Sequence, residues 1–256
     1  MFQFRFSRGV LWSALFLTAV TGANAQTSSA QTPPESKRLS VGAIVGYPIT
    51  GSSQEVSSSV NTSETTPPTV TDTLVESKGA PFTGGAAIRY DFSERFGAGA
   101  DILHRRGGYN STVIISEQIT DGNSTADLLL STFEETRAHL LDIPILGRYY
   151  FKDRSQGGGV RPYVTGGLAL RFATGASSLS EIADQDQVTD TDLTTIGPAN
   201  DSTLGGVLGF GLRAADDVGL KVDVEFRYTR WADPIFQSGP ANSNNNQVDI
   251  LVAFTF

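Results

Sequence analysis

Residues 218–230 alternate strictly between apolar and polar side chains, and this pattern constrains the fold more than any other feature of the sequence. One face carries Leu220, Val222, Val224, Phe226 and Tyr228, and the other carries Lys221, Asp223, Glu225, Arg227 and Thr229. Successive side chains of a β-strand point to opposite faces, whereas the 3.6-residue period of a helix would mix these two sets. The segment therefore predicts a strand with one apolar face and one charged face.

The same alternation recurs along the chain and predicts eight strands, at 39–48, 80–92, 96–106, 139–151, 160–172, 203–214, 218–230 and 247–256. Tight turns rich in Gly, Asp and Ser join them at 93–95, 152–159 and 215–217, and the remaining connections at 49–78, 107–138, 173–202 and 232–246 are long and polar. Short turns at one end and long loops at the other are typical of outer-membrane barrels. We therefore predict an all-β fold, an eight-stranded antiparallel up-and-down transmembrane β-barrel with short periplasmic turns and long extracellular loops.

The direction of the apolar face separates a membrane barrel from a soluble, ligand-carrying barrel. A soluble carrier turns its large apolar side chains inward, and a membrane barrel turns them toward lipid. Aromatic residues near the predicted strand ends suit the two interfacial girdles of a membrane barrel: Tyr47, Tyr90, Phe92, Phe96, Tyr149, Phe151, Phe172, Tyr228 and Trp231. The last predicted strand also carries Phe254 and Phe256 in one register. These features favour the membrane barrel.

Charges of both signs on the polar face predict a network inside the barrel. An eight-stranded barrel is just wide enough for side chains to fill its lumen. Glycines 85, 97, 99 and 167 would make room there for long side chains. The predicted lumen charge network consists of Arg89, Asp101, Arg105, Asp142, Arg148, Arg171, Arg213, Lys221, Asp223, Glu225, Arg227 and Asp249. Its seven bases nearly balance its five acids, so we expect the side chains to pack the lumen shut.

The first 25 residues are expected to form a secretory signal peptide. Arg5 and Arg8 supply its positive region, residues 10–20 supply a short apolar region, and Ala23-Asn24-Ala25 gives the small-residue cleavage pattern before Gln26. Residues 26–37, rich in Gln, Thr, Ser and Pro, are expected to form a flexible leader. The barrel domain is therefore assigned to residues 38–256.

Two apolar clusters, at 113–115 and 128–130, stand out in the connection 107–138. One interpretation is a β-hairpin that extends its two flanking strands beyond the membrane. The other is an exposed sheet edge that recruits a partner strand.

Several segments resemble a known family. DIPILGRYYF at 142–151, RPYVTGGLALRF at 161–172, VEFRYTRW at 224–231 and a terminal aromatic strand are similar to bacterial outer-membrane β-barrel domains, which include the small barrels of the outer membrane protein A and X type and the PorT-like barrels. The resemblance covers about residues 38–256 and implies a fold and a location in the cell outer membrane more firmly than an activity. It also implies that Phe254 and Phe256 form the signal by which the assembly machinery recognises the last strand.

The amino-acid composition excludes several classes of function. The chain has no cysteine, two histidines and a formal net charge of −8. Thiolate nucleophiles and sulfur-bound metals are therefore excluded, and an acidic protein is a poor partner for nucleic acid. An acidic segment at 181–192 lacks the spacing of a calcium-binding EF-hand loop. We predict no catalytic, cofactor or metal site.

Three functions remain open. The leading hypothesis is a non-enzymatic barrel with a structural or adhesive role through its extracellular loops, and the first alternative is a narrow channel. The second alternative is a lipid-modifying enzyme built on His104 and His139, with serines and acids of the neighbouring loop: Ser111, Ser131, Glu134 and Glu135. The His-x-Ser spacing of the lipid A deacylases occurs at neither histidine. The expected partners are outer-membrane lipids, lipopolysaccharide and the barrel assembly machinery, and we expect a monomer.

Overall fold

The computed structural model describes residues 38–51, 53–62, 69–79, 81–121, 124–153, 159–184, 187–194, 199–216, 219–238 and 241–256. The predicted signal peptide, its cleavage site at Ala25 and Gln26, and the leader lie outside these residues. The described strands are β1 (Leu39–Pro48), β2 (Val56–Thr62), β3 (Thr69–Ser77), β4 (Thr83–Asp91), β5 (Phe96–Asp121), β6 (Ser124–Tyr150), β7 (Gly159–Asp184), β8 (Gln187–Thr194), β9 (Ser202–Ala215), β10 (Lys221–Trp231), β11 (Gln237–Ser238), β12 (Ala241–Asn242) and β13 (Asn246–Thr255). In these parts of the chain no helix is long and apolar enough to cross a membrane.

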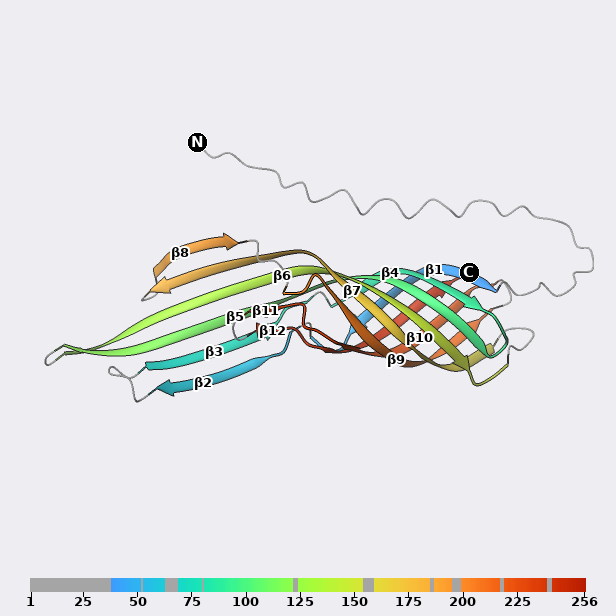
Figure 1. Ribbon diagram of the computed structural model, residues 1–256, viewed down its shortest axis with the longest axis horizontal. Coiled ribbons are helices and arrows are strands. Elements are labelled where there is room, and N and C mark those ends of the chain that lie inside the picture. The colour runs from blue at the N-terminus through green and yellow to red at the C-terminus, as the bar shows by residue number, and fades with distance from the viewer. Residues whose placement is uncertain are drawn as a thin grey trace, which may run out of the picture. The chain divides into compact units, whose positions relative to one another are not determined.

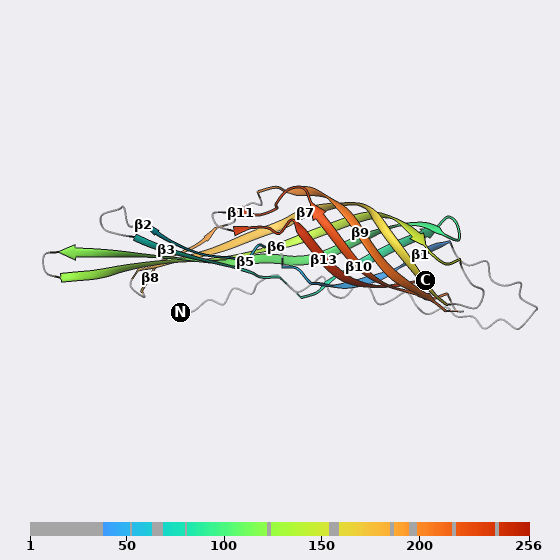
Figure 2. The same cartoon turned by 90° about the horizontal axis from the view of Figure 1, so that it is seen from below.

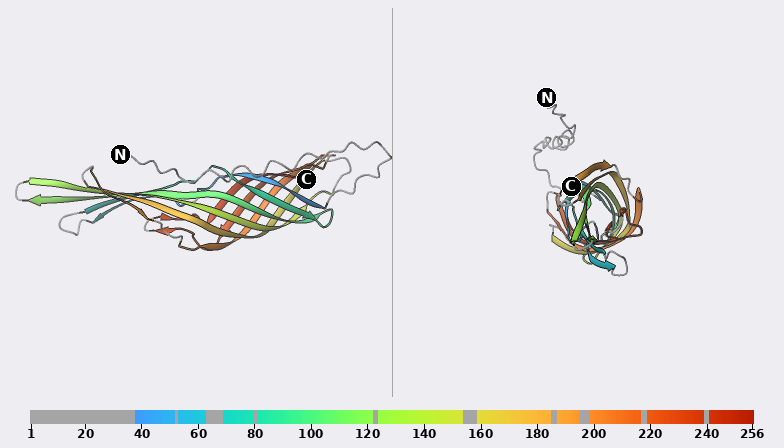
Figure 3. Two further views of the ribbon diagram at one scale, coloured as in Figure 1. Left: turned by 90° about the horizontal axis from the view of Figure 1, so that it is seen from above. Right: turned by 90° about the vertical axis from the view of Figure 1, so that its left-hand side faces the viewer.

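Eight of the strands close into a barrel. Their order is β5-β4-β1-β13-β10-β9-β7-β6, and β6 pairs back with β5, every pair being antiparallel. The ring of strands is visible end-on in the right-hand view of Figure 3. The predicted fold class, including the eight strands, is confirmed.

The alternating residues take the predicted faces. Along β10, Asp223, Glu225 and Arg227 are buried inside the barrel, while Val224 is 46% exposed on its outer wall. On the neighbouring strand β9, the side chain of Leu208 is 67% exposed. Charged side chains thus line the interior and large apolar side chains cover the outside, as lipid requires.

Short connections close one end of the barrel. Between β9 and β10, the backbone N–H of Asp216 donates to the carbonyl of Leu220 at 3.0 Å, and the Asp216 side chain accepts from the N–H of Leu220 at 2.8 Å. Gly219 completes this turn with a φ of +96°, a conformation that side chains other than that of glycine rarely adopt. The other end of the barrel carries the long connections.

Three barrel strands continue far beyond the length that a membrane needs. β5 has 26 residues, β6 has 27 and β7 has 26, whereas about 9–11 residues of a tilted strand span the hydrocarbon core. Beyond the barrel, β3 joins β5 and β8 joins β7, so that β2-β3-β5-β6-β7-β8 form a six-stranded sheet, which we call the extracellular sheet. Figures 1 and 2 show it continuing from the end of the barrel opposite the short turns.

These connections were predicted to be long loops, and the structure differs by forming strands in all four of them, although those in 232–246, β11 and β12, have only two residues each. The segment 107–138 is the predicted hairpin, in which Ile115 lies opposite Leu130. β3 covers β5 along Tyr109–Glu117 and β7 covers β6 along Leu130–Ala138, so among the described residues an exposed edge remains at 118–121 and 124–129, near the tip of the hairpin. The alternative, an edge that recruits a partner strand, stays a prediction.

The connection between β10 and β13 folds into the mouth of the barrel. Ile235 and Phe236 are 2% and 6% exposed and pack in one apolar cluster with Tyr109 and Leu140. The Ser243 hydroxyl accepts hydrogen bonds from the backbone N–H groups of Ile235 at 2.7 Å and Phe236 at 3.1 Å. The extracellular mouth therefore contains a small apolar core of its own, above the charged lumen.

Candidate functional site

All twelve residues of the predicted lumen charge network point into the barrel, and each is at most 7% exposed. Burying a charge is unfavourable unless it is paired and hydrogen-bonded. Eleven of the twelve meet in two clusters of ion pairs, and Lys221 instead donates to the Ser40 hydroxyl at 2.5 Å.

The cluster nearer the short turns, called here the periplasmic cluster, joins four arginines to four carboxylates: Arg89, Arg148, Arg213 and Arg227 with Asp91, Asp101, Asp223 and Glu225. Asp223 accepts from Arg213 Nε at 2.6 Å and from Arg148 Nη1 at 2.8 Å. Glu225 accepts from Arg148 Nη2 at 2.8 Å and from Arg227 Nε at 2.7 Å. Arg148, on β6, therefore bridges two carboxylates of β10.

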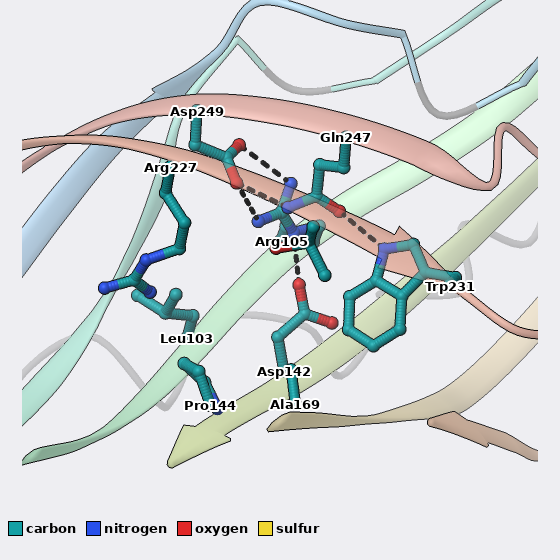
Figure 4. Close-up of a pocket in the computed structure, with 10 residues that line it drawn as sticks. Leu103, Arg105, Asp142, Pro144, Ala169, Arg227, Trp231, Gln247 and Asp249 are labelled. Carbon is teal, nitrogen blue, oxygen red and sulfur yellow. Dashed lines mark hydrogen bonds and ion pairs between the residues drawn. The ribbon is translucent and has the colours of Figure 1, made fainter. Parts of the chain in front are cut away.

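The second cluster, called the extracellular cluster, joins Arg105 and Arg171 to Asp142 and Asp249. Arg171 donates to both oxygens of Asp142, from Nε at 2.6 Å and from Nη2 at 2.8 Å. The Arg105 guanidinium lies between two carboxylates (Figure 4), with Nε 2.8 Å from Asp142 and Nη2 3.3 Å from Asp249. Gln247 links the ends, since it donates to Asp249 at 2.5 Å and accepts from Arg171.

Each cluster is electrically neutral. The periplasmic cluster has four arginines and four carboxylates, and the extracellular cluster has two of each. Neutrality matters because an unpaired ion in a narrow, poorly hydrated lumen would carry a penalty of several kcal/mol. Arginine suits both clusters because its planar fork of donors can reach two carboxylates at once.

Two residues of the barrel interior, Asp91 and Arg161, were not predicted from the sequence. Asp91, the last residue of β4, accepts from Arg213 at 3.1 Å. Arg161, at the start of β7, is 5% exposed and stacks over the Tyr150 ring at 4.1 Å. Both stand beside turns, where charged residues ordinarily contact water. Each lies an even number of residues from a predicted inward residue of its own strand, Asp91 from Arg89 and Arg161 from Arg171, and this parity could have identified both as interior residues.

The assignment of Trp231 to an interfacial girdle is wrong. Its side chain is 3% exposed, its indole N–H donates to Gln247 at 3.1 Å, and the Arg171 guanidinium lies 4.0 Å from its ring centre. Trp231 shares the odd register of the charged face of β10, and this parity places it inside. It packs against the extracellular cluster (Figure 4).

A small cavity lies between the two clusters. Its volume is about 10 Å³, which is room for roughly one water molecule. Its lining, drawn in Figure 4, comes from both sides of the lumen: Leu103, Arg105, Asp142, Pro144, Ala169, Arg227, Thr229, Trp231, Gln247 and Asp249.

The four glycines named in the sequence analysis divide into two kinds. A Cβ on Gly99 would lie 2.8 Å from the Arg89 side chain, and one on Gly97 would lie 2.9 Å from the Asp91 carboxylate, so these two make room for interior side chains. A Cβ on Gly85 or Gly167 would instead strike a backbone carbonyl of the adjacent strand. These two allow close approach of the strands.

Aromatic side chains line the short-turn end of the outer wall around β4, β5 and β6. Phe92 stacks on Phe96 with ring centres 6.3 Å apart, Phe96 contacts Tyr149 at 5.2 Å, and Tyr149 contacts Phe151 at 5.5 Å. Such a band matches the aromatic girdle at a membrane interface. Just beyond it, Arg95 donates two hydrogen bonds to Asp153, and these hold the pKa of the Asp153 carboxyl below its ordinary value.

Phe254 and Phe256 are exposed on the outer wall, at 43% and 63%. The backbone of Phe256 exchanges two hydrogen bonds with Val41, at 3.1 and 3.2 Å, at the seam where β13 meets β1. Their role as an assembly signal stays a prediction.

The two histidines meet on the outer wall of β5 and β6, where His104 Nε2 lies 3.1 Å from His139 Nδ1. The serines proposed beside them do not approach. Ser111 is buried on the opposite face of β5, and Ser131 stands eight residues along β6 from His139, a distance of roughly 26 Å at the rise of a strand. Glu134 bonds to the Tyr109 hydroxyl at 3.0 Å and Glu135 to Arg137 at 2.7 Å.

A closed barrel with a charged interior, an apolar outer wall and an aromatic girdle defines a β-barrel protein of the outer membrane. The model of one family, described as the outer membrane protein beta-barrel domain, matches residues 24–230. The chain belongs to this family, and it resides in the cell outer membrane. The family and location predicted from the sequence are confirmed.

Comparisons with individual proteins add two distant likenesses. The outer membrane protein OprG from Pseudomonas aeruginosa is 14% identical, with 85% of this chain and 92% of that chain covered and a TM-score of 0.31. The transport unit of the autotransporter AIDA-I from Escherichia coli is 10% identical, with 90% and 93% covered and a TM-score of 0.20. No curated protein matches the chain.

Proposed function

We propose that this protein is a non-enzymatic, non-conducting barrel that holds an ordered sheet outside the cell for contact with other surfaces. The observation that carries the proposal is the unbroken course of β5, β6 and β7 from the barrel wall into the extracellular sheet. Strands beyond the hydrocarbon core serve no purpose in spanning the membrane. A rigid sheet continuous with a membrane anchor presents its faces and edges to whatever approaches the cell.

The packed lumen supports the non-conducting part of the proposal. Ion pairs of the periplasmic cluster cross from β6 to β10, and those of the extracellular cluster cross from β5 to β13. Ions could pass only if several of these buried pairs separated together. The narrow channel is therefore the weaker alternative.

The arrangement of the histidines counts against a lipid-modifying enzyme. Nucleophilic catalysis needs a serine within hydrogen-bond reach of its base. Ser111 and Ser131, the two candidates, are on the wrong face or too far along the strand.

We predict that the purified protein conducts no steady ionic current in a planar lipid bilayer. Neutral side-chain clusters above and below a cavity of about 10 Å³ leave no water column for ions. A general porin inserted in the same bilayer provides the positive control. Reproducible channels of defined conductance from the unmodified protein would favour the narrow-channel hypothesis instead.

The surface-contact role is tested by shortening the extracellular sheet without touching the barrel. Thr112 and Phe133 lie opposite each other on β5 and β6, so replacing residues 113–132 with an Asn-Gly turn should close a shorter hairpin. Cells that produce this variant should adhere less to abiotic and cellular surfaces than cells with the full-length protein. Equal amounts of heat-modifiable barrel in both membranes serve as the control, and equal adhesion would overturn the proposed role.

A further inference from the structure

The outer wall of β5 and β6 changes abruptly from apolar to basic at the extracellular edge of the barrel. Ile102 and Ile145, which are 49% and 61% exposed, belong to the lipid-facing band. The next outward-facing residues along β5 are His104 and Arg106, and Arg106 is paired in register with His139 of β6. We call His104, Arg106 and His139 the outer-wall basic site.

A second row of charges lies further out. Arg137 donates to Glu135 at 2.7 Å, and Lys78 Nζ lies 3.8 Å from the same carboxylate. Glu135 is therefore engaged by two cations of its own. By contrast, no ion pair joins Arg106 to any other residue that the structure describes. Arg106 is an exposed guanidinium with its donors available.

One pair of strands in the barrel wall is irregular at this site. The register of β6 with β7 shifts between Ala138 and His139, where His139 faces Thr174 and Ala138 faces Ala176. A bulge of this kind redirects side chains and is common at the rims of barrels. The extra residue lies on β7, and the pairing of β6 with β5 is regular here, so His139 meets His104 diagonally across these two strands, with ring centres 5.3 Å apart and the two ring nitrogens 3.1 Å apart.

A recess opens beside Arg106. A cavity of about 290 Å³ is lined by Arg106, Tyr47, Ile49 and Pro81 and, on its inner side, by residues of the barrel mouth that include Arg105, Leu140 and Arg171. Glu55 is the one acidic residue of its lining. Arg106 therefore borders open space at the mouth of the barrel, and neither histidine lines that space. This recess is about thirty times larger than the interior cavity.

We propose that the outer-wall basic site binds the phosphorylated headgroup of a lipid in the outer leaflet, the chemistry found in the lipid A part of lipopolysaccharide. The site lies where apolar side chains give way to water, which is the depth of a lipid phosphate. Arginine is suited to phosphate because its planar fork donates two parallel hydrogen bonds. His104 and His139 are hydrogen-bonded to each other, which uses one N–H of the neutral pair and leaves the other imidazole N–H as a further donor.

A metal ion is the competing ligand for two facing histidines. Imidazole is a common ligand of zinc, copper and nickel. The guanidinium of Arg106, directly opposite His139, would repel such a cation, whereas it attracts an anion. The charge beside the histidines therefore favours phosphate.

The test uses the full chain, folded in a non-ionic detergent, and three probes: bisphosphorylated lipid A, the same lipid with its phosphates removed, and inorganic phosphate. The variant R106Q removes the charge, and R230Q is the matched control. Arg230 is another exposed arginine near the extracellular end of the outer wall, on β10, where it donates to Asn246 at 2.9 Å. Both substitutions are on the surface, and heat modifiability verifies that both variants fold.

We expect R106Q to weaken binding of bisphosphorylated lipid A by about tenfold, the loss of one charge-assisted hydrogen-bonding group, and R230Q to leave it nearly unchanged. Removing the lipid phosphates should weaken binding to the unmodified protein by a similar factor and have little further effect on R106Q. Equal affinities of R106Q and R230Q would overturn the proposal. So would inorganic phosphate competing at the concentration of the lipid, or binding that disappears when EDTA removes divalent metals.

Discussion

Replacing Asp223 with alanine should lower the free energy of unfolding by about 3–5 kcal/mol, the largest effect that we expect from any single substitution in the lumen. Asp223 accepts hydrogen bonds from Arg213 at 2.6 Å and Arg148 at 2.8 Å, and a third guanidinium, that of Arg89, lies 3.8 Å away. Alanine would leave three buried positive charges beside an empty position. Urea unfolding in lipid vesicles, followed by the gel mobility of the folded barrel, measures the loss.

The matched control is the Asp153→Ala variant. Asp153 also accepts from an arginine, Arg95, at 2.5 Å, but both side chains are 50% exposed at the short-turn end. Water and salt screen an exposed pair, so its removal should change stability little. Similar losses from the two substitutions would mean that the periplasmic cluster contributes no more than a surface ion pair.

The Leu208→Arg variant should be destabilised by about 2–4 kcal/mol, because an arginine on the lipid face near the middle of the membrane must lose its hydration. Leu208 stands halfway along β9 with its side chain 67% exposed on the outer wall. Val224, on the adjacent strand, should respond in the same direction. The same unfolding measurement in vesicles applies.

Ser58→Arg is the comparison for this substitution. Ser58 is exposed on β2, in the extracellular sheet, where water surrounds an added charge. Its replacement should leave the free energy of unfolding nearly unchanged. If Leu208→Arg were equally well tolerated, the assignment of the lipid-facing wall would be wrong.

The eight barrel strands could be predicted because each separates two different environments. Lipid on one side and a packed, charged lumen on the other force the period of two seen in residues 221–231, and a shift of one residue would exchange the faces. The direction of side chains at the ends of the strands was harder to predict. At Trp231 two expectations conflict, since an aromatic residue at a strand end suits a girdle but its register places it inside.

The extracellular sheet could not be predicted for the opposite reason. In VSSSVNT of β2, six of the seven residues are exposed, so water lies near both faces, neither face needs apolar side chains and no alternation arises. Only the hairpin of β5 and β6 carries apolar clusters that reveal it. The meeting of His104 with His139 was foreseeable from antiparallel pairing, but the exposed, unpaired state of Arg106 beside them depends on which carboxylates its neighbours engage.

The unbroken strands also determine how the molecule would respond to mechanical load. A surface that pulls on the tip of the hairpin pulls along β5 and β6, which enter the barrel without an intervening hinge. Ladder hydrogen bonds lie perpendicular to the strands, so a pull along the strands loads many of them in shear at the same time. Rupture would therefore require a whole row of bonds to fail together, and the force would reach the membrane before the sheet came apart.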